Sequence, residues 1–231
     1  MPLFSGLGRG PQSGYKGSEF FYRLIRAVLF IFYSAMFHFR YFGTSKVPKD
    51  SDARGVILAP NHASYLDPPI LGISLNRRVT FLAKEYLFKN FFVGAVLRGI
   101  GAYPIKSEKE DFRSIRDLIR LLKSGQCVVV FPEGTRAEDG HFKAPESGIG
   151  FLAAKSGASV VPVYIRGSYE AYPKGAKFFK PRAIEAYFGE PFIPAESQSL
   201  MRETDPYGAT SLEIMTRIRK IKADVDSGSF Q

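Results

Sequence analysis

Residues 110–136 read EDFRSIRDLIRLLKSGQCVVVFPEGTR, and this stretch decides the class of fold. Its first half repeats apolar residues at three- and four-residue steps, which predicts one apolar face of a helix over residues 110–122. Gly125 is placed to close that helix. The apolar run Cys127–Phe131 then predicts a buried strand, and polar residues follow it at once. The apolar positions of the helix are Phe112, Ile115, Ile119 and Leu122.

The same alternation of strand and helix continues on both sides of this stretch. Strands separated by helices predict an α/β fold, a mixed sheet flanked by helices, in one domain over residues 46–231. The predicted strands are Val56–Ala59, Val79–Ala83, Ala102–Ile105, Val160–Ile165 and Ala183–Phe188, and the further predicted helices are Gly148–Lys155 and Leu212–Lys222.

The N-terminal part differs in composition from the rest of the chain. Residues 1–17 are rich in Gly, Ser and Pro, which predicts a flexible tail. Residues 18–45 are aromatic, and their uncharged run Ala27–Phe37 is about half of the ~20 residues that span a bilayer. With basic flanks, this segment predicts an amphipathic helical anchor in the headgroup region. The alternatives are a helix packed on its own domain and a short true span.

The net charge of +10 favours a polyanionic partner without identifying it. Nucleic acid, anionic lipid headgroups and phosphorylated small molecules all remain open. A single cysteine, Cys127, excludes an internal disulfide, and its apolar surroundings predict a buried structural thiol. His38, His62 and His141 lie far apart without metal-ligand spacing, so we expect no metal site.

The segment Asn61-His62-Ala63-Ser64-Tyr65-Leu66-Asp67 follows the first predicted strand. His62 and Asp67 meet only if the segment is a turn that leads into a helix, and Pro68 with Pro69 favours such a turn. Asp67 would then hold one imidazole nitrogen of His62 while the other faces the substrate, as in a catalytic triad. Taken alone, the pair is also compatible with a structural histidine.

A second polar segment, Glu133-Gly134-Thr135-Arg136, follows the strand Cys127–Phe131. Gly134 allows close approach of a ligand to the backbone, Thr135 supplies a hydroxyl, and Arg136 supplies a planar fork suited to phosphate. The alternative is an ordinary strand-to-loop turn with a surface arginine. Val161-Pro162-Val163 lies in a later core strand.

In this order, the segments resemble the glycerolipid acyltransferases related to the bacterial 1-acyl-sn-glycerol-3-phosphate acyltransferase. The resemblance covers roughly residues 45–195 and implies a glycerol-phosphate acyltransferase-like fold. It implies that His62 is the catalytic base and Asp67 its orienting carboxylate, in an HxxxxD motif. The family's substrate-binding residues correspond to Glu133, Gly134, Thr135 and Arg136 (EGTR, for the acceptor phosphate) and to Lys84. Lys84 belongs to a family block, K-x-x-L-x6-G, that Leu87 and Gly94 complete, and the strand Val161-Pro162-Val163 matches a further family feature.

The chain departs from the family pattern after the predicted strand Ala102–Ile105. Ser107 stands where the family has an arginine that helps to hold the acceptor phosphate, and Lys106 precedes it. We expect Lys106 to substitute as a point charge, although lysine lacks the bidentate fork of arginine.

The resemblance implies transfer of a fatty acyl group from acyl-CoA or acyl carrier protein to the free hydroxyl of 1-acyl-sn-glycerol-3-phosphate, giving phosphatidic acid. Such an enzyme would work without a cofactor, as a peripheral or monotopic protein on the cytoplasmic face of the cell membrane, and would not bind nucleic acid. Three alternatives remain: another acceptor such as a different lysophospholipid or lyso-ornithine lipid, a covalent route through Ser64, and a non-catalytic protein that binds anionic lipid or nucleic acid.

Overall fold

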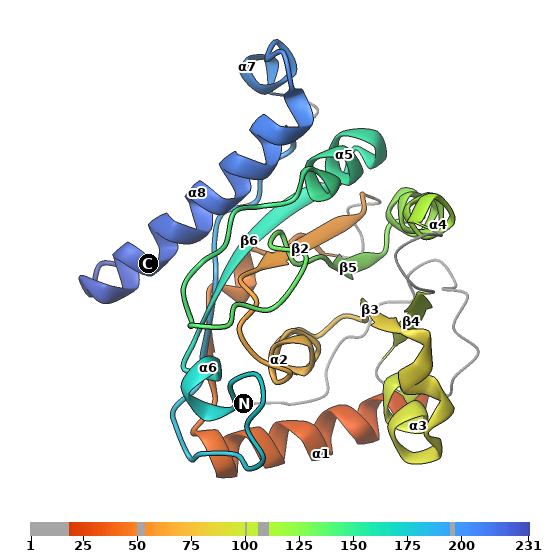
Figure 1. The fold of residues 1–231 in the computed structure, drawn as a ribbon, viewed down its shortest axis with the longest axis vertical. Coiled ribbons are helices and arrows are strands. Elements are labelled where there is room, and N and C mark those ends of the chain that lie inside the picture. The colour runs from red at the N-terminus through yellow and green to blue at the C-terminus, as the bar shows by residue number, and fades with distance from the viewer. Residues whose placement is uncertain (1–18, 50–53, 100, 106–110, 195–196) are drawn as a thin grey trace.

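The computed structural model describes residues 19–49, 54–99, 101–105, 111–194 and 197–231. Within these ranges the chain forms a seven-stranded mixed sheet with helices on both faces (Figure 1), which confirms the predicted fold class. The order of the strands is β1-β7-β6-β2-β5-β3-β4. The strands are β1 (Arg40–Phe42), β2 (Val56–Pro60), β3 (Val79–Lys84), β4 (Ala102–Ile105), β5 (Cys127–Val129), β6 (Ser159–Arg166) and β7 (Glu185–Phe188).

Five neighbouring strands, from β6 through β2, β5 and β3 to β4, run parallel. Their carboxyl ends therefore meet at one edge of the sheet, which is where ligands gather in open α/β folds. β7 is antiparallel to β6, and β1 pairs with β7. Because β2 and β5 are direct neighbours, the segments that follow them lie side by side.

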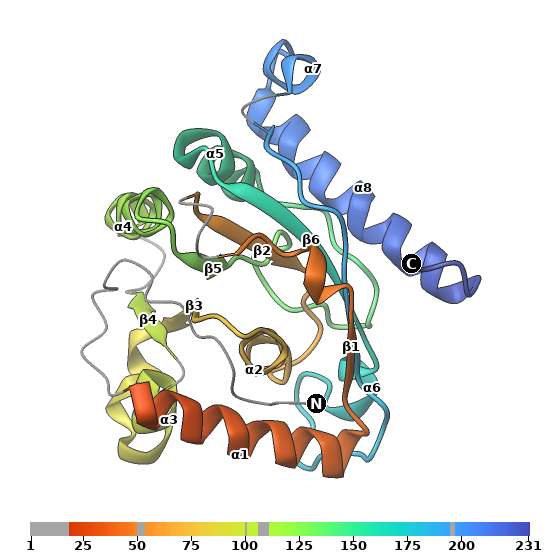
Figure 2. The same cartoon turned by 180° about the vertical axis from the view of Figure 1, so that it is seen from behind.

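The helices form two layers, which Figures 1 and 2 show from opposite sides. Helices α1, α2 and α3 cover one face of the sheet, and α4, α5 and α8 cover the other. The α-helices are α1 (Glu19–Phe37), α2 (Asp67–Ser74), α3 (Phe91–Gly99), α4 (Asp111–Lys123), α5 (Ser147–Ser156), α6 (Ser168–Ala171), α7 (Gln198–Met201) and α8 (Pro206–Asp226), and the 3-10 helices are η1 (Thr44–Lys46) and η3 (Glu85–Lys89).

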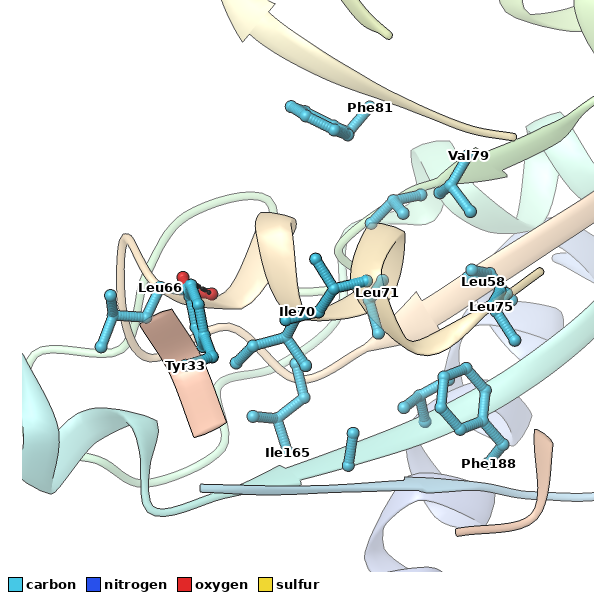
Figure 3. Close-up of a cluster of buried hydrophobic side chains, with 14 of the residues drawn as sticks. Tyr33, Leu58, Leu66, Ile70, Leu71, Leu75, Val79, Phe81, Ile165 and Phe188 are labelled. Atoms are coloured by element: carbon cyan, nitrogen blue, oxygen red, sulfur yellow. Dashed lines mark hydrogen bonds between the residues drawn. The ribbon is translucent and has the colours of Figure 1, made fainter. Parts of the chain in front are cut away.

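Alternating side chains of the strands build one core on each face, because successive residues of a strand point to opposite sides. In β2, Val56 and Leu58 belong to the cluster under α1 and α2, whereas Ile57 and Ala59 belong to the cluster under α4, α5 and α8. Figure 3 shows the first cluster, with Ile70 of α2 at its centre. The buried thiol of Cys127 lies in this cluster, as predicted.

Helix α1 lies on the protein along one side and is exposed along the other. Tyr33 and Phe37 are buried in the core, while Phe20, Val28 and Ile31 are 74%, 58% and 67% exposed. By length and composition alone, α1 is also apolar enough to cross a membrane.

The predicted helical segment 18–45 is wrong at its C-terminal end. Helix α1 ends at Phe37, and His38 adopts a left-handed conformation with φ of 46°. Arg40–Phe42 then forms β1 against β7, so the sheet domain begins before residue 46. Aromatic residues favour strands as readily as apolar helices, and only the pairing with the distant β7 decides between them.

Other boundaries differ from prediction by a few residues. β5 ends at Val129 rather than Phe131, β7 begins at Glu185 rather than at residue 183, and α8 is longer at both ends than predicted. Helix α3 was not predicted from the sequence. Gly125 does follow α4 with a φ of 82°, as expected for a residue that closes a helix.

Two glycines in α5 provide a matched test of how closely this helix packs on α8. A Cβ atom at Gly150 would lie 2.0 Å from the backbone oxygen of Tyr207, whereas a Cβ atom at Gly148 would meet nothing within 4 Å. We predict that Gly150→Ala lowers the free energy of unfolding by about 1–3 kcal/mol through overpacking. Gly148→Ala should leave it unchanged or raise it by no more than about 1 kcal/mol. Urea denaturation measures both, and equal effects of the two variants would contradict this packing.

Candidate active site

The segment after β2 is attached to the neighbouring strand β6 by Asn61. The side-chain amide of Asn61 donates to the carbonyl of Ile165 at 3.1 Å, and its oxygen accepts from the Ile165 amide at 2.7 Å. A buried amide paired on both sides fixes the direction in which the chain leaves the sheet. His62 is the next residue.

His62 and Asp67 are in direct contact, in the turn that the sequence predicted. The Nδ1 atom of His62 lies 2.9 Å from Oδ2 of Asp67, which also accepts from the amides of Ala63 (2.8 Å) and Ser64 (2.7 Å). Asp67 is fully buried and begins helix α2, with proline at its first positions. Because a carboxylate only accepts hydrogen bonds, Nδ1 carries the hydrogen and Nε2 keeps its lone pair. The His62 side chain is 15% exposed.

Helix α1 also contacts this turn, through a hydrogen bond from Tyr33. The hydroxyl of Tyr33 donates to the carbonyl of Leu66 at 3.0 Å (Figure 3). Burial raises the pKa of Tyr33, and the nearby Asp67 raises it further, so the hydroxyl remains a donor. This contact was not predicted, because no local signal connects a residue of α1 with one 33 positions later.

The second motif follows β5, the neighbour of β2, and Glu133 joins it to the His62 turn. Oε1 of Glu133 accepts from the backbone amide of His62 at 2.9 Å, and Oε2 accepts from the amide of Lys143 at 2.8 Å. In return, the carbonyl of His62 accepts from the amide of Ala137 at 2.8 Å. Glu133 is 2% exposed, and this burial raises its pKa. Glu133 thus helps to position His62 through the backbone of the turn.

Phe131 completes the surroundings of the imidazole. Its ring stacks on that of His62 with centroids 3.8 Å apart and planes 23° from parallel. The ring of His62 is therefore fixed by Asp67 at one nitrogen and by Phe131 across one face. Phe131 lies two residues before the first residue of the motif, and the sequence analysis assigned it only to the strand.

The remaining residues of the second motif have different surroundings. Gly134 has a φ of 66°, which favours glycine, and its amide closes a turn onto the carbonyl of Phe131. The hydroxyl of Thr135 accepts from the Lys143 ammonium group at 2.6 Å. These contacts maintain the turn.

Arg136 is the residue of this motif with unused hydrogen-bonding capacity. Its guanidinium carbon lies 3.4 Å from the ring centroid of Tyr65, so the two groups stack. Its Nη1 atom is buried and has no hydrogen-bond partner among the described residues. Stacking leaves the edges of a guanidinium group available to an anion, and a buried donor without a partner suits a ligand that would accept from it.

Lys84 and Lys106 are the two further predicted binding residues. Lys84 is the last residue of β3, at the same edge of the sheet as the two motifs. Lys106 and Ser107 lie outside the described residues. Val161-Pro162-Val163 lies within β6, in the sheet core.

The structure thus brings together His62, Asp67, Glu133 and Arg136 from two segments about seventy residues apart. It adds supporting residues that the sequence analysis did not assign to the site: Tyr33, Asn61, Tyr65, Phe131 and Lys143.

Residues 38–166 match the model of a protein family described as Acyltransferase. The chain is 29% identical over 187 residues to the 1-acyl-sn-glycerol-3-phosphate acyltransferase of Bacillus subtilis, which covers 80% of this chain and 88% of that protein. It is 34% identical over 139 residues to a chloroplastic 1-acyl-sn-glycerol-3-phosphate acyltransferase of Arabidopsis thaliana, covering 58% of this chain but only 38% of that longer protein.

The fold is also similar to a solved structure. The crystal structure of the 1-acyl-sn-glycerophosphate acyltransferase PlsC from Thermotoga maritima superposes with a TM-score of 0.71 at 28% sequence identity. The similarity covers 87% of this chain and 80% of that chain.

The two backbone hydrogen bonds that Glu133 accepts can be tested by measuring the free energy of unfolding of a variant. A glutamine at this position keeps one acceptor oxygen but presents an amide nitrogen to the second backbone N–H group. We predict that Glu133→Gln lowers the free energy of unfolding by about 1–3 kcal/mol, the cost of a buried unpaired donor. The control is Glu138→Gln, because Glu138 is exposed, and its denaturation midpoint should stay close to the parent's. A Glu133→Gln midpoint that matches this control would refute the structural role.

Proposed function

The chain belongs to the acyltransferase family, and from this premise we propose that it transfers a fatty acyl group to the free hydroxyl of 1-acyl-sn-glycerol-3-phosphate, giving phosphatidic acid. The observation that carries this proposal is the 2.9 Å contact between His62 Nδ1 and Asp67 Oδ2, which leaves Nε2 of His62 as a base. Membership of the family makes the chain an acyltransferase rather than a non-catalytic binder of lipid or nucleic acid.

The proposed chemistry is one direct transfer. Nε2 of His62 takes the proton of the acceptor hydroxyl while the oxygen attacks the thioester carbonyl of acyl-CoA or acyl carrier protein. The carbon–sulfur bond then breaks, and the departing thiolate takes the proton back from the imidazolium. Asp67 stabilises the imidazolium through Nδ1. General-base help of this kind contributes about 100- to 10,000-fold to the rate.

The geometry argues against a covalent route through Ser64. Ser64 is fully buried, and its hydroxyl donates to the carbonyl of Tyr172 at 2.7 Å and accepts from the amide of Leu66 at 3.2 Å. A nucleophile would need its hydroxyl directed at a base and open to the substrate. Direct transfer is therefore the version that we propose.

Arg136 is the proposed ligand of the acceptor phosphate. Its guanidinium group is held by Tyr65, a residue of the His62 turn, so the phosphate would be positioned relative to the base by the same turn. Several relatives are named for 1-acyl-sn-glycerol-3-phosphate, which supports this acceptor over lyso-ornithine lipid. Lys84 and Lys106 remain proposed contributors.

We place the enzyme at a membrane surface, as a monotopic protein on the cytoplasmic face. Helix α1 buries Tyr33 and Phe37 in the domain and exposes apolar side chains along its outer side. A helix fixed in this way favours lying in the interface over spanning the bilayer. The acceptor and its product are membrane lipids, so this location puts the site where both are found.

Arg136 can be tested with a panel of acceptors and one labelled acyl-CoA. The panel contains 1-acyl-sn-glycerol-3-phosphate, lyso-ornithine lipid and monoacylglycerol, which lacks the phosphate. We predict that 1-acyl-sn-glycerol-3-phosphate gives the highest kcat/KM. Arg136→Gln should lower that value roughly 10- to 100-fold, as expected for a lost charged hydrogen bond of about 1.5–3 kcal/mol, without a similar loss for monoacylglycerol.

Arg219→Gln on the exposed side of α8 is the matched control and should behave like the parent. If another acceptor is preferred, the assigned substrate is wrong. If Arg136→Gln lowers the rate equally for acceptors with and without phosphate, the assigned role of Arg136 is wrong.

A further inference from the structure

The connection between α6 and β7 has an unusual composition for a surface loop. Residues 173–183 read PKGAKFFKPRA, with four basic residues, no acidic residue and two adjacent phenylalanines. Phe178 is 82% exposed and Phe179 is 44% exposed. We call this segment the basic-aromatic loop. Exposed apolar residues that adjoin one another form a patch, and such patches mark sites of contact with another molecule.

The positive charge of the basic-aromatic loop is largely unneutralised. Lys174 pairs with Glu138 at 2.5 Å. Lys177, Lys180 and Arg182 are exposed and form no ion pair with any described residue. Cations on both sides of an exposed aromatic pair are the pattern by which interfacial segments bind anionic bilayers.

The basic-aromatic loop is continuous with the exposed side of α1. The ring of Phe179 packs edge-on against Phe32, with centroids 6.2 Å apart, and against Phe37 at 6.0 Å. Figures 1 and 2 both show the loop that follows α6 beside the C-terminal end of α1. Ile31 and Phe32 are 67% and 38% exposed on the neighbouring helix surface. The two segments therefore form one surface that is both apolar and basic.

This surface also reaches the candidate active site. Tyr172, which precedes the loop, packs against Phe179 with centroids 4.6 Å apart, and lies 6.5 Å from the ring of Tyr65. The carbonyl of Tyr172 accepts from Ser64 in the His62 turn. Tyr65 in turn stacks on Arg136. Contact of the loop with headgroups would thus place Arg136 near the level of the lipid phosphates.

We propose that the basic-aromatic loop is a second lipid-binding element, which inserts Phe178 at the headgroup boundary and pairs Lys177, Lys180 and Arg182 with anionic headgroups. Together with α1 it fixes the orientation of the site toward the bilayer. This inference rests on the membrane location proposed above for the enzyme. An acidic protein such as an acyl carrier protein is the competing partner for a basic surface, but the exposed Phe178 and the apolar continuity with α1 favour the bilayer.

The test is vesicle sedimentation of the full chain and its variants. One set of vesicles contains phosphatidylglycerol and phosphatidylcholine, and the other contains phosphatidylcholine alone. A basic residue near an anionic surface strengthens binding about fivefold. Loss of two such residues in Lys177→Glu combined with Lys180→Glu should therefore weaken binding to the anionic vesicles by about 20-fold or more. Phe178→Ser should weaken binding to both sets, as should Ile31→Ser on α1.

Matched controls lie on α8, which covers the face of the sheet opposite α1. Leu212→Ser removes an apolar side chain that is 57% exposed, and Arg219→Glu with Lys220→Glu reverses two exposed charges. Both controls should bind vesicles as the parent does. Transfer to a short-chain acceptor in solution, without vesicles, should be unchanged in the loop variants, which separates failed docking from failed chemistry.

Three results would overturn the inference. If the parent binds vesicles and the loop variants bind equally well, the loop is not a lipid contact, although α1 remains one. If the loop variants keep vesicle binding but lose transfer from acyl carrier protein and not from acyl-CoA, the loop docks the carrier. If the parent binds neither set of vesicles, both the proposed membrane location and the loop inference are wrong. The proposed acyltransferase activity would not be affected by that result, because it is measured in solution without vesicles.

Discussion

Asp67 Oδ2 is the atom on which the hydrogen bonds of the site converge. It accepts from the imidazole of His62 and from the amides of Ala63 and Ser64, so one buried oxygen sets both the orientation of the ring and the shape of the turn that carries it. A carboxylate without exposure to water is costly unless hydrogen-bonded. Here the turn supplies three donors to Oδ2, whereas Oδ1 has no hydrogen-bond partner among the described residues. The base His62 and the carboxylate that orients it both belong to the seven-residue segment 61–67. The position of each therefore depends on the other.

The rest of the fold holds this turn from several directions. Tyr33 binds the carbonyl of Leu66 from α1, Glu133 binds the amide of His62 from the segment after β5, and Asn61 attaches the start of the turn to β6. Each of these groups is buried and paired, so loss of one partner leaves a polar group unsatisfied. Helix α1 exposes apolar side chains on its outer side and directs Tyr33 toward the site on its inner side. The helix that we propose to contact the membrane therefore also supports the His62 turn.

The sequence predicted the parts of the structure that local patterns determine. The apolar runs identified the core strands, and the two prolines after Asp67 indicated the turn that lets it reach His62. The surroundings of Glu133 were not predictable, because its partners lie 71 residues before it and 10 residues after it, and a motif letter does not say whether a carboxylate faces solvent or backbone. Likewise, the end of α1 at His38 depends on pairing between β1 and β7, which are more than 140 residues apart. The basic-aromatic loop has a clear composition, yet only its packing on Phe32 connects it to α1.

The most direct test of the account is a double-mutant cycle between His62 and Asp67, read as kcat/KM for acyl transfer. His62→Ala should lower the rate about 100- to 10,000-fold, with an unchanged circular dichroism spectrum. Asp67→Asn should also lower it, and the double variant should be no slower than His62→Ala alone, because the carboxylate acts through the imidazole. Losses that multiply in the double variant, or turnover that survives in His62→Ala, would contradict the claim that His62, held by the buried Asp67, is the base of the reaction.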